Sequence, residues 1–184
     1  RKPKRNIMKI TYIHGLESGP IGPKSTWLND KFDTYIPSVN YKDPSSFERI
    51  LNKCKGSSLI IGSSMGGYFA YLISLHLGIP TLLFNPAVIG RTTNPIVEEP
   101  NKPKRAKHSI YLGKRDNVIN GSLVKKWFSN NGTGSFVYNK YDGEHRVDYD
   151  IFIDAVSDVL NLKESMGVES FESFHNLNKK EIYN

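Results

Sequence analysis

The segment IIGSSMGGYFAYL, residues 60–72, changes from a short apolar run to a helical pattern at a cluster of glycines and serines. The helical pattern continues until Gly78, so a strand has to turn sharply into a helix with Ser64 at the turn. Such a turn crowds the residues two before and two after its apex. Those residues are Gly62 and Gly66, which carry no Cβ. The pattern therefore predicts an exposed serine nucleophile at Ser64. Ser63, flanked by Ile61 and Met65, lacks this frame.

Short apolar runs alternate with helical patterns along the rest of the chain. This alternation predicts an α/β fold, with a mostly parallel central sheet of about six strands and helices on both faces. We expect one domain over residues 1–184, without a large cap. The Pro-rich segment 88–107 is expected to be a long loop over one end of the sheet. The expected strands are 7–14, 34–39, 58–62, 81–85, 108–113 and 134–139, and the expected helices are 24–32, 45–55, 64–77, 121–130 and 146–162.

Composition places the chain among ordinary globular proteins, with 38% hydrophobic and 23% charged residues. No apolar stretch is long enough to cross a bilayer, and the basic start contains no secretory apolar region. The single cysteine, Cys54, is typical of a reducing compartment. These features predict a cytoplasmic protein. Residues 1–7 are left open as an extension before a start at Met8, and residues 163–184 as a tail or an extra helix.

The net charge of +7 is carried partly by basic clusters at 1–5, 102–108 and 178–180. Such clusters can attract nucleic acid or an acidic surface. No nucleic-acid-binding motif accompanies them, so we interpret them as solvated surface and do not expect a nucleic-acid partner. The sequence predicts no oligomeric state.

A serine hydroxyl needs a base and an orienting carboxylate, and in an elbow protein these follow in the order Ser, Asp, His. Asp116 comes just after the run ending at Gly113, and His145 precedes the last helical pattern. Because the carboxyl ends of parallel strands lie at one sheet edge, Ser64, Asp116 and His145 are expected to converge. Asp142 is a rival acid, expected instead to shape the turn before His145. None of the other histidines combines loop placement with the required chain order: His14, His76, His108 and His175.

Acyl transfer also requires donors for a developing oxyanion. The expected donors are the N–H of Met65, directly after the nucleophile, and that of Leu16, after the flexible Gly15. The sequence shows no metal-ligand cluster, and neither a metal nor an organic cofactor is expected. Besides Leu16 and Met65, the residues expected to frame the substrate pocket are Glu17, Pro86 and Val88, with the loop 88–107.

Four motifs together resemble the α/β-hydrolase superfamily, and more narrowly the small bacterial YqiA-type esterase family. They are YIHGLESGPIGPKSTWL, LIIGSSMGGYFAYLISLHLGIPTLLFNPAV, YLGKRDNVI and DGEHRVDYDIF, in family order from about Ile10 to Leu160. The resemblance implies carboxylester or thioester hydrolysis, with nucleophile, acid, base and oxyanion donors at the positions given above. Two positions depart from the family pattern, Asn117 after the aspartate and Val147 two residues after the histidine.

The leading hypothesis is a serine esterase or thioesterase that forms an acyl-enzyme on a small-molecule acyl ester or thioester. The basic loop residues favour anionic acyl substrates such as a coenzyme-A thioester. Two alternatives stay open. One is a peptidase or amidase, because the same triad cleaves amides. The other is a noncatalytic scaffold that binds a protein or nucleic acid through its basic surface.

Overall fold

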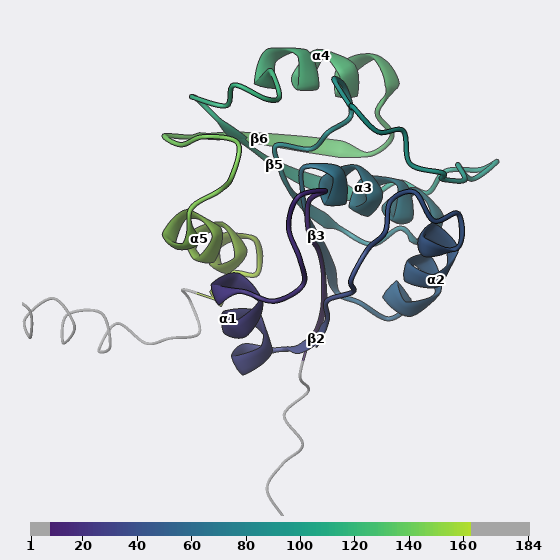
Figure 1. Ribbon diagram of the computed structural model, residues 1–184, viewed down its shortest axis with the longest axis horizontal. Helices are drawn as coiled ribbons and strands as arrows, with labels where there is room; N and C mark the ends of the chain where they lie inside the picture. Colours follow the sequence, from purple (N-terminus) through teal and green to yellow (C-terminus); the bar gives the residue numbers. More distant parts are fainter. Residues whose placement is uncertain (1–7, 163–184) are drawn as a thin grey trace, which may run out of the picture. The chain divides into compact units, whose positions relative to one another are not determined.

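The computed structural model describes residues 8–162, so the expectations for residues 1–7 and 163–184 lie outside the described part. Six strands form one sheet in the order β2-β1-β3-β4-β5-β6, and every neighbouring pair is parallel (Figure 1). The strands are β1 (Lys9–Ile13), β2 (Asp33–Tyr35), β3 (Leu59–Ser63), β4 (Thr81–Phe84), β5 (Lys107–Gly113) and β6 (Ser135–Tyr141). The helices are α1 (Pro23–Lys31), α2 (Ser45–Cys54), α3 (Met65–Leu77), α4 (Gly121–Asn131) and α5 (Tyr149–Val159).

The predicted α/β fold is confirmed, and the element boundaries that differ from expectation include the end of β2 and the start of α5. The strand expected over 34–39 ends at Tyr35, and Pro37, which has no N–H, cannot extend the ladder. The helix expected from residue 146 begins only at Tyr149. Residues before it belong to a loop in which Val147 is buried and its carbonyl accepts a hydrogen bond from Lys24.

The main core lies between the sheet and helices α2, α3 and α4. Apolar side chains from all three helices join those of alternate strand residues in one buried cluster. Helix α3 is buried on nearly all sides, because it crosses the middle of the sheet and contacts β1, β3 and β4. Helix α1 contributes nothing to this cluster and lies on the other side of the sheet (Figure 1).

The strand order places several loops at one edge of the sheet. Chain order reverses between β1 and β3, which is the position where parallel α/β sheets open a crevice for ligands. The loops that follow β3, β4, β5 and β6 all leave from this carboxyl edge. Residues far apart in sequence are thereby brought together there.

By its internal contacts the chain divides into two units. The first runs to Tyr149 and holds the whole sheet with α1 to α4, and the second begins at Asp150. In its described part, which ends at residue 162, the second unit consists of α5 from Asp150 onward followed by a short turn at residues 160–161. Among residues 8–162, no helix combines the length and apolarity that crossing a bilayer would require.

Candidate active site

Ser64 lies between β3 and α3 in a conformation that few non-glycine residues adopt, with φ 54° and ψ −116°. The surrounding backbone leaves no room for a side chain at Gly62 or at Gly66. A Cβ on Gly62 would lie 2.3 Å from the Gly66 carbonyl oxygen, and one on Gly66 would lie 2.1 Å from the carbonyl oxygen of Ile13. The strained turn therefore requires glycine at both positions.

The side chains of Ser64, His145 and Asp116 form one line of hydrogen bonds. His145 Nε2 lies 2.9 Å from Ser64 Oγ, and His145 Nδ1 lies 2.7 Å from Asp116 Oδ2. A carboxylate oxygen only accepts, so Nδ1 carries the proton and Nε2 is left to accept from the serine hydroxyl. This is the geometry that a general base needs in order to remove the serine proton.

Asp116 is held by its own loop as well as by the histidine. Its Oδ1 accepts hydrogen bonds of 2.8 Å from the N–H groups of Val118 and Ile119, and its side chain is only 2% exposed. The rival Asp142 points elsewhere, because its carboxylate pairs with Arg115 at an exposed position. Of the two carboxylates, only Asp116 contacts the histidine.

The loop after β5, residues 114–120, and the loop after β6, residues 142–148, are joined by backbone hydrogen bonds. The N–H of Lys114 donates to the Tyr141 carbonyl over 3.0 Å, and the N–H of Arg115 donates to Gly143 over 2.9 Å. At the start of the first loop, a Cβ on Gly113 would lie 2.7 Å from the Glu144 carbonyl oxygen. We call residues 114–120 the acid loop and residues 142–148 the histidine loop.

Asn85 is a site residue that the sequence reasoning missed. It follows β4 directly, is 1% exposed, and its side-chain amide bonds to groups at the end of β5, directly before the acid loop, and within the histidine loop. The sequence feature that could have indicated Asn85 is its place in FNPAV, between an expected strand and a proline. Only the structure distinguishes such a buried polar residue from an ordinary loop asparagine.

The two residues expected to supply oxyanion donors, Leu16 and Met65, line one cleft together with Ser64. Met65 is the first residue of α3, where an N–H has no acceptor within the helix. The turn after β1 also approaches closely, since a Cβ on Gly15 would lie 3.4 Å from Ser64 Cβ, and Leu16 lines the same cleft. His14, directly before this turn, is buried and holds the backbone: its ring nitrogens bond to the Gly15 carbonyl and the Val39 N–H.

A cleft of about 810 Å³ opens over Ser64 and His145. Of the expected substrate-binding residues, Glu17 lines this cleft, whereas Pro86 and Val88 do not. Val88 is 2% exposed and belongs to the core, and Pro86 packs against Gly67 at the start of α3. Ala87, between them, faces the cleft instead.

The charges that line the cleft balance one another, three cations against three anions. The pKa of Lys24 is lowered, mainly by burial and further by the nearby positive charge of Arg146, while Asp148 opposes this. Arg91 is held by the Ala87 and Val88 carbonyls, with its guanidinium carbon 4.2 Å from the centroid of the Tyr68 ring. The charged residues of the lining are Lys24, Arg91, Arg146, Glu17, Glu144 and Asp148.

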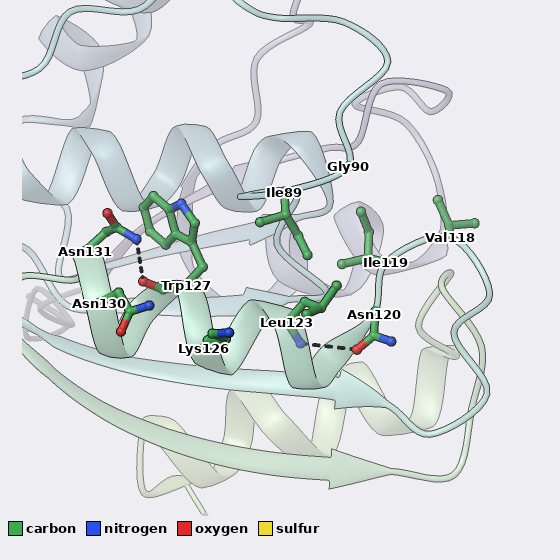
Figure 2. Close-up of a pocket in the computed structure, with 10 residues that line it drawn as sticks. All are labelled: Ile89, Gly90, Val118, Ile119, Asn120, Leu123, Lys126, Trp127, Asn130 and Asn131. Atoms are coloured by element: carbon green, nitrogen blue, oxygen red, sulfur yellow. Dashed lines mark hydrogen bonds between the residues drawn. The ribbon is translucent and has the colours of Figure 1, made fainter.

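A second, smaller hollow of about 450 Å³ runs along α4 and is mostly apolar (Figure 2). Ile89, Leu123 and Trp127 contribute to it, and Asn120 caps the helix that forms one wall. Three residues line both this hollow and the cleft over Ser64: Gly90, Val118 and Ile119. The two hollows are therefore neighbours, and Ile119 connects their shared wall to the Asp116 carboxylate.

The sequence profile of one family matches residues 9–120, from the start of β1 to the cap of α4. The chain belongs to the uncharacterised protein family UPF0227. This confirms the family resemblance found in the motifs. The matched range includes Ser64 and Asp116 but stops before His145.

Solved structures with the same fold include several hydrolases. A candidate hydrolase of the α/β superfamily from Xanthomonas campestris pv. campestris has a TM-score of 0.63 at 20% identity, covering 86% of this chain and 99% of that one. SOBER1 from Arabidopsis thaliana gives 0.58 at 15% identity, covering 82% and 96%. The RedJ thioesterase of the prodiginine pathway in Streptomyces coelicolor gives 0.59 at 11%, covering 81% and 83%. At these identities the likeness shows the α/β-hydrolase fold.

Proposed function

We propose that this protein is a serine hydrolase that cleaves carboxylesters or acyl thioesters through an acyl-enzyme. One observation carries the proposal: a single imidazole, that of His145, lies within hydrogen-bond distance of Ser64 Oγ on one side and of the Asp116 carboxylate on the other. The hydrolases and thioesterases that share the fold support the same class of chemistry.

In the proposed mechanism His145 Nε2 takes the proton of Ser64 as the serine oxygen attacks the acyl carbonyl. Asp116 keeps the protonated imidazole oriented through Nδ1. The N–H groups of Leu16 and Met65 stabilise the negative charge on the carbonyl oxygen. His145 then donates its proton to the leaving alcohol or thiol, and a water molecule, deprotonated by the same nitrogen, hydrolyses the acyl-enzyme.

The lining of the two hollows supports a substrate with an apolar acyl chain. The reacting carbonyl would lie at Ser64, with the chain extending past the shared residues Val118 and Ile119 toward Leu123. Both Val118 and Leu123 are more than half exposed, at 62% and 51%, so a chain bound there would remove apolar surface from water.

An anionic substrate finds less support than the sequence suggested. The segment that carries the basic residues 102–105 is tied to the far end of α3, where the Lys104 N–H bonds to the Leu75 carbonyl. Leu75 lies ten residues after Met65, or about 15 Å along the helix. Since charges are screened over about 8 Å at physiological salt, this segment contributes little at Ser64.

The first test is labelling with a fluorophosphonate, which reacts only with an activated serine. We expect the native chain and Ser63→Ala to label, and Ser64→Ala and His145→Ala not to label. Ser63→Ala is a close control, because it removes the neighbouring hydroxyl from the same turn. A folded native chain that fails to label would contradict the proposal, as would labelling that survives in Ser64→Ala.

Turnover then separates the reaction classes. We expect hydrolysis of p-nitrophenyl esters and of acyl thioesters, and no comparable cleavage of peptide anilides. Preference for the anilide would favour the peptidase alternative. Binding of a macromolecule that survives Ser64→Ala, without turnover of any ester, would favour the noncatalytic alternative.

A further inference from the structure

Asn85 occupies the residue directly after β4, between the nucleophile and the two loops that carry the acid and the base. It is 1% exposed and has a φ of 43°, which asparagine tolerates better than most residues. Its backbone N–H donates to the Tyr111 carbonyl on β5 over 2.9 Å. The backbone thus fixes where the side chain begins.

The Asn85 side chain uses both ends of its amide. Oδ1 accepts from the Gly113 N–H over 2.8 Å, at the end of β5 and directly before the acid loop. Because a backbone N–H can only donate, this bond determines which end of the amide is oxygen. The amide nitrogen then donates to the His145 carbonyl over 2.8 Å and to the Tyr141 hydroxyl over 2.6 Å.

Tyr141 extends this connection. Its hydroxyl accepts from Asn85 and donates to the Glu144 carbonyl over 2.8 Å, one residue before the histidine. Burial raises the pKa of Tyr141 to about 12, although the Asn85 hydrogen bond lowers it in part. The hydroxyl therefore keeps its proton at any ordinary assay pH, and the bond to Glu144 is retained.

The residues on either side of Asn85 hold the nucleophile. The Phe84 carbonyl accepts from the Ser64 N–H over 2.9 Å, and the Ala87 N–H donates to the Ser64 carbonyl over 2.9 Å. One short segment, residues 84–87, therefore bonds to the backbone of Ser64 and, through the side chain of Asn85, to the backbone of His145.

We propose that Asn85 is a positioning residue that holds the backbone of His145 in register with Ser64, so that Nε2 stays within reach of Oγ. This inference rests on the proposed function. Asn85 contacts the backbone of His145, and it acts on Ser64 Oγ through the imidazole. The role requires an amide: an aspartate keeps the acceptor for Gly113 but has no donor for the His145 carbonyl or the Tyr141 hydroxyl.

The test compares full-length variants of similar shape. Asn85→Asp removes both donors, and Tyr141→Phe removes only the hydroxyl that leads to Glu144. The control is Asn139→Asp, which makes the same amide-to-carboxylate change on β6. Within residues 8–162, the Asn139 side chain forms no hydrogen bond to the acid loop or to the histidine loop. Far-UV circular dichroism and urea unfolding establish that each variant is folded. Fluorophosphonate titration gives the concentration of reactive serine.

With p-nitrophenyl acetate, we expect kcat per reactive serine to fall about 100-fold in Asn85→Asp, as a misplacement of about 1 Å can cause. Tyr141→Phe should lose about 5-fold and Asn139→Asp less than 2-fold, with KM changed less than 3-fold throughout. A merely structural role would lower the free energy of unfolding and leave kcat per reactive serine unchanged. If folded Asn85→Asp and Tyr141→Phe keep kcat within 2-fold of the native value, the inference is overturned.

A second readout does not depend on turnover. The proton between His145 Nδ1 and Asp116 should give a downfield ¹H NMR resonance, assigned by its loss in His145→Ala. We expect Asn139→Asp to keep this resonance and Asn85→Asp to lose it. If the native chain hydrolyses neither esters nor thioesters, the proposed function fails, and the resonance alone decides the inference. An unchanged resonance in Asn85→Asp would overturn the inference.

Discussion

Ser64 has a positive φ in a turn where Gly62 and Gly66, two residues to either side, leave no room for a Cβ. Gly66 is the tighter of the two flanking glycines, since an added Cβ would lie 2.1 Å from the Ile13 carbonyl oxygen. The added Cβ would be attached to the backbone at the start of α3, and the carbonyl oxygen belongs to the backbone at the end of β1. Neither can move away without disturbing the elbow.

We therefore expect Gly66→Ala to lower the free energy of unfolding by about 3 kcal/mol or to prevent folding. Gly19→Ala is the control, because a Cβ there meets no atom within 4 Å. Urea unfolding monitored by tryptophan fluorescence measures both. Equal stability of the two variants would contradict the described geometry of the elbow.

Asp116 accepts three hydrogen bonds, and replacing its carboxylate by an amide affects one of them selectively. In Asp116→Asn the amide oxygen can keep the bonds from Val118 and Ile119, which leaves the amide nitrogen facing His145. A donor there favours the tautomer with the proton on Nε2, and that nitrogen can no longer accept from serine. We expect kcat for an ester to fall about 10³- to 10⁴-fold.

Asp142→Asn is the matched control, because its carboxylate pairs with Arg115 at an exposed position. It should change kcat less than 2-fold. A large loss in Asp142→Asn together with a small one in Asp116→Asn would reassign the acid.

At the residue scale, the sequence indicates candidate site residues through their spacing and chain order. It does not indicate how buried side chains pack. The glycine spacing indicated Ser64, and the order of the loops indicated Asp116 and His145. The direction in which a buried side chain points has no such signature. For this reason Val88 was expected in the pocket but lies in the core, and Asn85 was not expected at all.

At the element scale, helix α4 forms one wall of the hollow that we assign to the acyl chain. Leu123 is half exposed on that wall, so a polar substitution there should leave folding intact. We expect Leu123→Asp to lower the ratio of kcat/KM for a p-nitrophenyl dodecanoate to that for the acetate about 10-fold. The reason is that several methylene groups lose an apolar contact, each worth about 0.8 kcal/mol when fully buried.

Ser129→Asp introduces the same charge on an exposed part of α4 that does not line the hollow. It should leave the ratio of the two esters unchanged. An equal fall for both esters in Leu123→Asp would place the acyl chain elsewhere.

Periodicity predicted the elements well where the local pattern decides them. The helices over α1 to α4 begin and end within about one residue of expectation, since capping and hydrophobic spacing are local signals. The exceptions have tertiary causes. Helix α5 starts later than its pattern because residues before it form the histidine loop, with Val147 buried and bonded to Lys24.

At the scale of the whole molecule, stability should depend on pH through His108. This residue is 0% exposed; its Nε2 faces the Thr133 carbonyl and its Nδ1 faces the Thr81 hydroxyl. Burial lowers the pKa of His108 from 6.5 to about 4. The unfolded chain therefore binds this proton first as the pH falls, and stability is lost between pH 6.5 and 4.

The loss amounts to about 3 kcal/mol over that range, because each pH unit contributes up to about 1.4 kcal/mol. Urea unfolding at pH 7.5 and 4.5 measures the loss of unfolding free energy on acidification. We expect this loss to be smaller in His108→Gln than in the native chain by about 3 kcal/mol. His76→Gln serves as the control on another noncatalytic histidine. If His108→Gln and the native chain lose the same stability on acidification, another group is responsible.

The arrangement of the site has a consequence for synthesis on the ribosome. Ser64 follows the third strand, whereas His145, the proposed base, follows the sixth, and β6 pairs only with β5 within the described sheet. A growing chain can complete the turn around the serine well before residue 145 has been added. A nascent or truncated chain that ends before β6 therefore contains the proposed nucleophile without the proposed base, and we expect fluorophosphonate reactivity to begin only when the last strand of the sheet docks.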